Sequence, residues 1–311
     1  MSPPFRSRSA GIGIGALTVL LLPALQPAGA ASPSGNTSAR PPSPWIWLVP
    51  GGGQFALGRP RAGWGYAAGT MGLVGWGAHA ETRRGGGELN APFVYAQQLY
   101  VASFCAAYRE LRLRAGDPGG GPPTDRSSAG ELAAAPFRWR QLKNPWVIGS
   151  ALVGAGLNLA LPRSDSRKPA FRQIRRIRYL GDSFNREWGT AAYTAYWIPI
   201  SLGAGVAEES LFRGLFQNEW ERSWGARNGW AAASGLFGLA HLSQPGDLES
   251  WGDVAFATAA GLYLGWRYQR TGYRLEEPVA SHVWFDIAAG LALMLVRPED
   301  NPLGARVQFA F

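Results

Sequence analysis

At 311 residues the chain is long enough for two soluble domains or one multi-helix membrane domain, and its composition favours the second. Charged residues make up 16% of it, against roughly 25% in an average soluble protein, while 42 Gly, 14 Trp and 14 Phe suit packed membrane helices. The single cysteine, Cys105, excludes an intrachain disulfide, a cysteine zinc site and a dithiol redox centre, and lies in an apolar run typical of a core residue.

The net charge of +9 raises the question of nucleic-acid binding. The basic residues cluster beside apolar segments, which is the pattern of membrane flanks, so we expect a lipid bilayer as partner and no nucleic acid. The mean hydropathy of -0.10 is low for a protein made only of membrane spans. Long polar connections rich in Pro, Gly and Arg account for that value and leave the apolar segments intact.

Residues 1–30 have the features of a secretory signal peptide. Two arginines precede an apolar stretch from Ala10 to Leu25, and Ala28-Gly29-Ala30 has the small residues that signal peptidase requires. Cleavage after Ala30 is the favoured interpretation, and an uncleaved first span is the alternative. Residues 31–44 are rich in Ser and Pro and are predicted to be a linker.

Residues 45–116 are predicted to form an N-terminal membrane hairpin region. A Gly- and Trp-rich apolar pair over 45–79 is interrupted at residues 58–61, and a third apolar run extends from Phe93 to Tyr108. The start, Pro50 to Phe55 followed by a Gly-Arg pair, resembles a short bacterial membrane hairpin motif, PGxGQxxxGR. Its glycines would let two helices or a re-entrant turn approach closely. No Gly-Lys-Ser/Thr follows, which argues against a phosphate loop.

Residues 117–187 are predicted to be a loop followed by an amphipathic basic segment. The stretch from Asp117 to Ala134 is rich in Gly, Pro and Ser and is expected to be a loop, and a short apolar segment covers Trp146 to Leu161. The basic stretch Arg163 to Arg178 predicts an amphipathic helix on an anionic membrane surface. Four apolar residues recur at helical spacing in or beside it: Phe171, Ile174, Ile177 and Leu180.

Residues 188–311 are predicted to be an intramembrane domain. We expect spans at 188–207, 210–220, 229–242, 252–269 and 279–296. Several are shorter than the roughly 20 residues that a span needs, so protein must cover them. The fold class that follows is all-α, a polytopic helical membrane protein with its active site in a helix-bundle cavity, multi-pass in a bacterial cytoplasmic membrane. The final run, Arg306 to Phe311, alternates in polarity and is expected to be a frayed tail.

Three apolar segments of this domain carry ionisable groups, which are costly in a membrane and therefore indicate function. Glu209 and Arg213 are four residues apart, so they share a helix face and can pair, whereas Glu208 is rotated by about 100° and stays free. A free carboxylate in a low-dielectric cavity suits a general base that takes a proton from water. His241 could share that water.

His282 and Asp286, again four residues apart, point to one place where an imidazole could stabilise an oxyanion. Two other interpretations stay open. The Glu209/Arg213 and His282/Asp286 pairs could merely hold helices together, or the glutamate and the histidines could bind zinc. The chain has no HExxH motif.

Taken in order, Glu208-Glu209-x-x-x-Arg213, Phe237-x-x-x-His241 and His282-x-x-x-Asp286 resemble the motifs of the CAAX-protease and bacteriocin-processing family, which includes type II CAAX prenyl endopeptidases. The resemblance implies metal-free glutamate chemistry without a cofactor. By it, Glu208 activates the water, His241 assists, His282 and residue 286 support the oxyanion, and Glu209 and Arg213 hold the site together. Prenyl proteases of the eukaryotic type have Asn at the last position, so the oxyanion role of Asp286 requires that it be protonated or orient His282.

The predicted function is an intramembrane, metal-independent endopeptidase that cleaves a peptide or protein substrate at the membrane. Prenylated, signal-like, bacteriocin-like and anchor peptides are all open as substrates. The alternatives are a catalytically silent membrane scaffold, a bacteriocin-immunity-type binding protein, and a metal-dependent membrane hydrolase.

Overall fold

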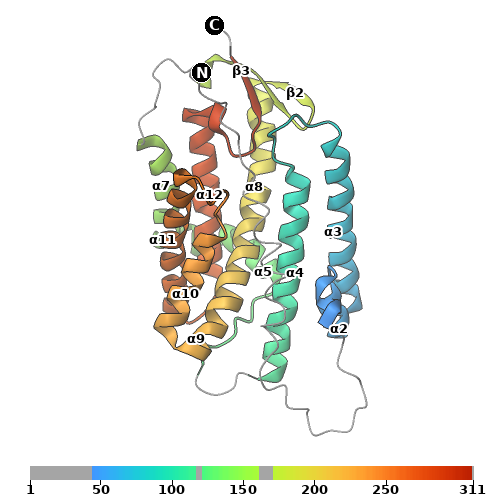
Figure 1. Ribbon diagram of the computed structural model, residues 1–311, viewed down its shortest axis with the longest axis vertical. Helices are drawn as coiled ribbons and strands as arrows, with labels where there is room; N and C mark the ends of the chain where they lie inside the picture. Colours follow the sequence, from blue (N-terminus) through green and yellow to red (C-terminus); the bar gives the residue numbers. More distant parts are fainter. Residues whose placement is uncertain (1–43, 117–120, 161–170, 310–311) are drawn as a thin grey trace.

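The protein is an elongated bundle of helices with a small sheet at one end (Figure 1). The computed structural model describes residues 44–116, 121–160 and 171–309 and is 75% helical. The signal-like segment 1–30 and the linker lie outside the described residues, apart from Pro44. The long helices are α3 (Pro60–Glu81), α4 (Ala91–Ala115), α7 (Pro145–Ala160), α8 (Arg186–Leu211), α11 (Leu248–Arg270) and α12 (Glu276–Val296). Shorter elements are η2 (Pro44–Leu48), α2 (Gly52–Ala56), α5 (Ala129–Ala134), η3 (Ala135–Phe137), α6 (Trp139–Leu142), η4 (Phe171–Gln173), α9 (Asn218–Trp224), α10 (Ala226–Leu239) and η6 (Pro298–Asp300).

The N-terminal region contains one apolar hairpin, α3 with α4, and a compact turn in front of it. Of the two alternatives for the apolar pair over 45–79, two helices or a turn, the first half forms a turn, because residues 45–57 contain only η2 and the five-residue α2. The glycines explain the tight turn: Gly51 has a φ of 76°, and a Cβ on Gly52 would lie 1.7 Å from the carbonyl oxygen of Ile46. Gln54 fastens the turn to α4 by donating from Nε2 to the carbonyl oxygen of Ser103 at 2.8 Å.

Part of the segment predicted as a loop between α4 and α7 is helical. A capping box between Ser128 and Glu131 starts α5, so the expectation of a loop through Ala134 is wrong for its last residues. The short apolar segment forms α7, which packs closely on α12. A Cβ on Gly154 would meet the carbonyl oxygen of Phe285 at 2.4 Å, so only glycine permits this approach.

The predicted spans 188–207 and 210–220 belong to one continuous helical rod. Asn185 caps α8 by accepting the backbone N–H of Trp188, and α8 continues through a π-helical segment, η5 (Phe212–Gln217), into α9. The expected break between the two spans is therefore wrong. Neighbouring helices bury the chain throughout the junction, so the rod needs no exposed loop there. A π-helical turn within an α-helix is frequently associated with function.

The predicted amphipathic helix at 163–178 is wrong where the structure describes it. Residues Ile174–Tyr179 form strand β1, which pairs antiparallel with β2 (Asp182–Asn185) and with the C-terminal strand β3 (Arg306–Phe309). A register irregularity between Ile174 and Arg176 lets Ile174 and Ile177 both be buried although they are three positions apart. A spacing of three positions between buried residues is also expected on one face of a helix, which is why the sequence predicted a helix here. Residues 306–309 are an ordered strand, so the expectation of a frayed tail is wrong there.

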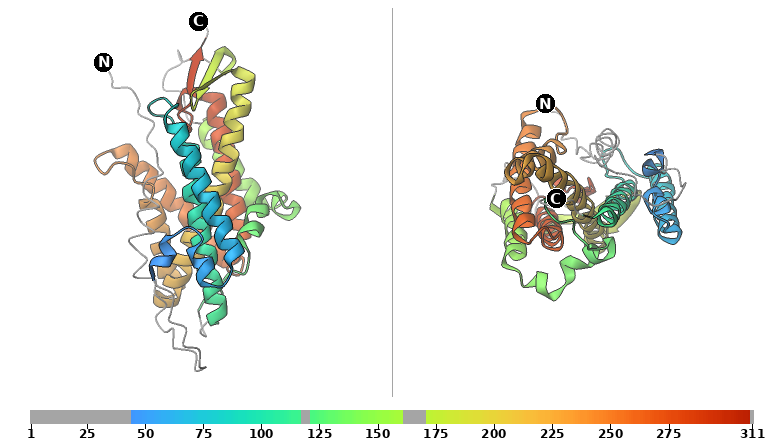
Figure 2. Two further views of the ribbon diagram at one scale, coloured as in Figure 1. Left: turned by 90° about the vertical axis from the view of Figure 1, so that its right-hand side faces the viewer. Right: turned by 90° about the horizontal axis from the view of Figure 1, so that it is seen from below.

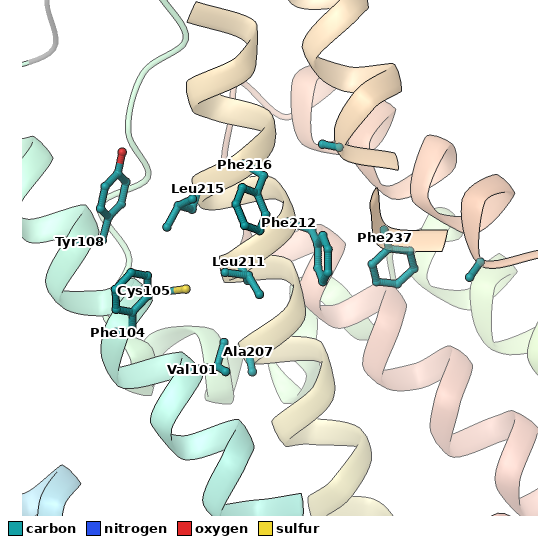
Figure 3. Packing of buried hydrophobic residues seen from close by; sticks show 12 residues of the cluster. Val101, Phe104, Cys105, Tyr108, Ala207, Leu211, Phe212, Leu215, Phe216 and Phe237 are labelled. Atoms are coloured by element: carbon teal, nitrogen blue, oxygen red, sulfur yellow. The ribbon is translucent and has the colours of Figure 1, made fainter. Parts of the chain in front are cut away.

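The bundle is held together by apolar clusters between the helices. In the cluster of Figure 3, side chains of α4 such as Phe104 and Cys105 meet Leu211 and Leu215 of the α8 rod, and Phe237 of α10 closes the other side. Cys105 is fully buried, as expected of a core residue. A second cluster joins the inner face of the sheet to α8 and α12. The α8 helix packs on α4 and α12, and the η5 segment that follows Glu208 and Glu209 packs on α10.

Candidate active site

The two glutamates lie at the end of α8, where the π-helical segment begins. Glu209 and Arg213 are both fully buried and form the ion pair that their spacing predicts, with 3.0 Å between Nη1 and Oε1. Arg213 also donates from Nη2 to the carbonyl oxygen of Gly261 in α11 at 3.2 Å. The pair therefore links α8 to α11. A buried charge is tolerated only when it is paired and hydrogen-bonded in this way.

His282 of α12 connects the two glutamates. Its Nδ1 lies 2.7 Å from Oε1 of Glu209, the same oxygen that receives Arg213. Because a carboxylate only accepts, Nδ1 of His282 carries the proton. This bond fixes the ring and directs Nε2 toward two other carboxylates: Oε2 of Glu208 at 3.9 Å and Oδ2 of Asp286 at 3.5 Å. The sequence did not indicate the Glu209–His282 bond, which joins residues 73 positions apart.

Glu208 keeps a carboxylate oxygen free of the protein. Its side chain is 15% exposed, and its buried Oε2 has no hydrogen-bond partner among the described residues. Glu209 also has a buried Oε2 without a hydrogen-bond partner in the described part of the chain, but its Oε1 binds both Arg213 and His282. Glu209 therefore pairs with Arg213, and Glu208 does not, as the spacing along the helix predicts.

His241 lies in the turn directly after α10, and not within a helix as the motif spacing suggested. Its Nδ1 donates to the carbonyl oxygen of Phe237 at 2.8 Å, which leaves Nε2 as an acceptor. Among the described residues, it makes no hydrogen bond to Glu208 or His282. It reaches the cluster through a shared neighbour, because the Phe237 ring lies 4.8 Å from the ring of His241 and 6.1 Å from that of His282.

Phe237, the first residue of the Phe237-x-x-x-His241 motif, lies at the centre of these contacts. The Arg213 guanidinium carbon lies over the Phe237 ring, 4.4 Å from its centroid, in the geometry of a cation–π contact. The Phe237 ring is thus a neighbour of Arg213 and of both histidines. Trp197 of α8 donates from Nε1 to the backbone oxygen of Asp286 at 2.9 Å. This hydrogen bond fixes the position of α12 along α8.

The site residues are carboxylates and imidazoles, which are also the ligand types of zinc. Within the part of the chain that the structure describes, no three His, Cys, Asp or Glu side chains are disposed to hold a metal ion. What the arrangement offers directly is a free carboxylate next to an oriented imidazole.

With this geometry the chain can be compared with known proteins. Residues 190–288 match the family model described as Type II CAAX prenyl endopeptidase Rce1-like. The resemblance drawn from the motifs is thereby confirmed over this part of the chain. The match runs from the second turn of α8 into α12 and includes all of Glu208, Glu209, Arg213, Phe237, His241, His282 and Asp286. No curated protein and no solved structure matches the chain.

Proposed function

We propose that the protein is a metal-independent intramembrane endopeptidase in which Glu208 activates the water that attacks the peptide bond. The observation that carries the proposal is the buried, unpartnered Oε2 of Glu208 facing Nε2 of His282. Because Glu209 already neutralises Arg213, the carboxylate of Glu208 is free to act as a base. The family match supports peptidase chemistry of the CAAX-protease type.

The residues divide the reaction between them. Glu208 takes one proton from water, and the resulting hydroxyl adds to the carbonyl carbon of the substrate. His282, whose Nδ1–H is held by Glu209, carries a second proton on Nε2 and donates a hydrogen bond from it to the carbonyl oxygen as negative charge develops there. Glu208 then returns its proton to the leaving nitrogen as the C–N bond breaks. His241 assists through its free Nε2, and Asp286 keeps Nε2 of His282 directed into the site.

Three helices, α12, α7 and α3, support insertion in a bilayer. By length and hydropathy, α12 is the one helix among the described residues that qualifies as a span, and the first fifteen residues of α7 form a shorter apolar helix. The exposed side of α3 is also suited to lipid, because it carries no charge between Arg61 and His79 and exposes Trp64 and Met71 by 67% and 63%. Its many glycines and tryptophans lower its mean hydropathy without adding a charged group. In Figure 2, α3 lies at the edge of the bundle, with α4 between it and the other long helices.

The mechanism is tested by Glu208→Gln, which keeps the shape of the side chain and removes the proton acceptor. Cleavage should fall by roughly 10² to 10⁴, the contribution of a general base, while folding is unchanged. The control is Glu249→Gln in the exposed first turn of α11, which should cleave normally. Purified protein in liposomes is incubated with prenylated CAAX peptides and with signal-type peptides, and products are identified by mass spectrometry. Near-normal cleavage by Glu208→Gln refutes this assignment.

A chelator arm separates the glutamate enzyme from a metal hydrolase. Wild-type activity should survive a strong chelator, because the carboxylate and not a bound ion activates the water. If chelation abolishes cleavage and zinc restores it, the glutamate mechanism is wrong. If wild type cleaves none of the peptides but retains one of them tightly, the protein is a binding scaffold.

A further inference from the structure

The outer face of the three-stranded sheet gathers arginines that the catalytic proposal does not use. Strand β1 directs Ile177 and Tyr179 toward the helices, so Arg176 and Arg178 point to the opposite face. The register places Arg306 of β3 directly opposite Arg178. The register irregularity leaves Arg175 without a cross-strand partner and exposed beside Arg176. We call Arg175, Arg176, Arg178 and Arg306 the arginine face.

The charges of the arginine face are poorly compensated. Like charges directly opposite each other on neighbouring strands destabilise a sheet, and Arg178 and Arg306 form such a pair. The other outer-face residues of the register are Ser183, Asn185 and Gln308, which carry no charge. The Asp182 carboxylate is bound by Arg83, and Glu88 lies 3.9 Å from Arg306. Among the described residues, Arg175 and Arg178 contact no carboxylate.

A cavity adjoins this face. It has a volume of about 510 Å³ and is lined by Arg175, Arg176, Val307, Gln308 and Phe309. Two guanidinium groups and an amide suit the oxygens of a phosphate, because guanidinium groups bind such oxygens with paired hydrogen bonds. Val307 and Phe309 are the half-buried register partners of the inward-facing Ile177 and Ile174, and on the edge strand β3 they add an apolar wall to the cavity. The lining therefore fits an anion that carries a hydrocarbon part.

The position of the cavity favours a lipid as that anion. Asn185, the register partner of Arg176, caps α8 at Trp188, and the Trp188 side chain is 71% exposed. An exposed tryptophan beside arginines, at the end of apolar helices, is typical of the bilayer interface. Figure 1 shows the sheet at this end of the bundle, beyond α3 and α4 and beside the start of α8. A nucleic acid would find here an arginine cluster whose neighbouring Phe309 is half-buried and offers no open stacking face.

We propose that the arginine face binds the phosphate of an anionic phospholipid, with Val307 and Phe309 against its glycerol and first acyl carbons. This function goes beyond the proposed peptidase activity and does not depend on it. The lipid supplies a negative charge to Arg175 and Arg176, the two arginines that line the cavity. It also anchors the sheet, and with it the first turn of α8, at the membrane surface.

The test uses the full chain purified in a neutral detergent. Short-chain phosphatidylglycerol and, separately, short-chain phosphatidylcholine are titrated, and the dissociation constants are measured calorimetrically. We expect wild type to prefer phosphatidylglycerol, and Arg175→Gln/Arg176→Gln to bind it at least about tenfold more weakly, since each arginine near an anionic surface accounts for a factor of roughly five. The matched control is Arg140→Gln/Arg227→Gln, two exposed arginines outside the sheet, which should bind like wild type. Peptide cleavage should be the same in both double variants.

Other outcomes overturn the proposal. Equal binding of the two lipids, or equal weakening by the control substitutions, means that the arginine face is not a lipid site. Inorganic phosphate that binds as tightly as phosphatidylglycerol means that the ligand is a free phosphate and not a lipid. A single-stranded oligonucleotide that binds more tightly than the lipid, and is lost with Arg175 and Arg176, makes the partner a nucleic acid.

Discussion

Two arginines of this molecule lie in opposite environments, one in the middle of the helix bundle and one at its sheet end. In the middle of the bundle, Arg213 is buried and contacts Glu209, the Gly261 carbonyl and the Phe237 ring. At the sheet end, Arg178 is exposed, contacts no carboxylate among the described residues and lies opposite another arginine. Because Arg213 is buried, its charge must be compensated by these contacts. The exposed guanidinium of Arg178 is solvated by water and needs no partner. The same residue type therefore supports the structure at one site and is available for a ligand at the other.

The largest effect is expected for Arg213→Ala. Removing one partner of a buried ion pair leaves Glu209 uncompensated and should lower the free energy of unfolding by about 3 to 5 kcal/mol. Peptide cleavage should fall as well, because Glu209 also holds His282. Thermal unfolding in detergent measures the stability, with the exposed Arg227→Ala as control. A variant of normal stability that has lost only activity would instead give Arg213 a direct part in catalysis.

Gly189→Ala tests the contact by which the sheet is fixed to α8. A Cβ at this position would lie 2.7 Å from Cβ of Ile177, so the sheet must shift and the protein should lose about 1 to 3 kcal/mol. Gly235→Ala in α10 is the matched control, because its Cβ would meet nothing within 4 Å. Cleavage should survive in both variants. Equal stability of the two variants would show that the sheet is only loosely attached.

Phe237→Leu removes the aromatic ring and keeps most of the apolar volume. Loss of the cation–π contact with Arg213 should cost about 1 to 2 kcal/mol. Cleavage should fall more than stability suggests, because both imidazoles lose the ring they contact. The control, Phe256→Leu on the exposed side of α11, loses only an aromatic contact with Phe285 and should leave the rate of cleavage unchanged. A drop in stability with an unaltered rate of cleavage would remove Phe237 from the positioning of the histidines.

The smallest effect has the opposite sign. Arg178→Thr removes the repulsion from Arg306 and should stabilise the protein by roughly 0.2 to 1 kcal/mol. Because exposed charges are screened by salt, the gain should shrink as the ionic strength rises from low values to about 1 M. Arg175→Thr, at a position without a cross-strand partner, is the comparison and should gain less. A loss of stability in Arg178→Thr would mean that Arg178 has a stabilising partner.

The sequence predicted the parts that depend on neighbours along one helix. The i, i+4 spacing of Glu209 and Arg213 was enough to predict their ion pair and to separate Glu208 from it. The apolar runs predicted α7, α11 and α12 within about four residues, whereas α4 continues through the basic residues to Ala115, beyond the apolar run that ended at Tyr108. Periodicity failed at residues 174–179, because a spacing of three fits a helix and a bulged strand equally well. Composition alone could not show that α8 continues without a break into η5.

The sequence by itself therefore determined the helical character of the chain, the family resemblance over its C-terminal part and the identity of the ionisable residues. Each of these follows from local spacing or from residue type. Only the tertiary structure decided that His282 binds Glu209, that Phe237 contacts both histidines, and that Ile174–Tyr179 pairs with a strand at the C-terminus. These contacts join residues far apart in the chain, and their free energy comes from burial that exists only once the helices have packed.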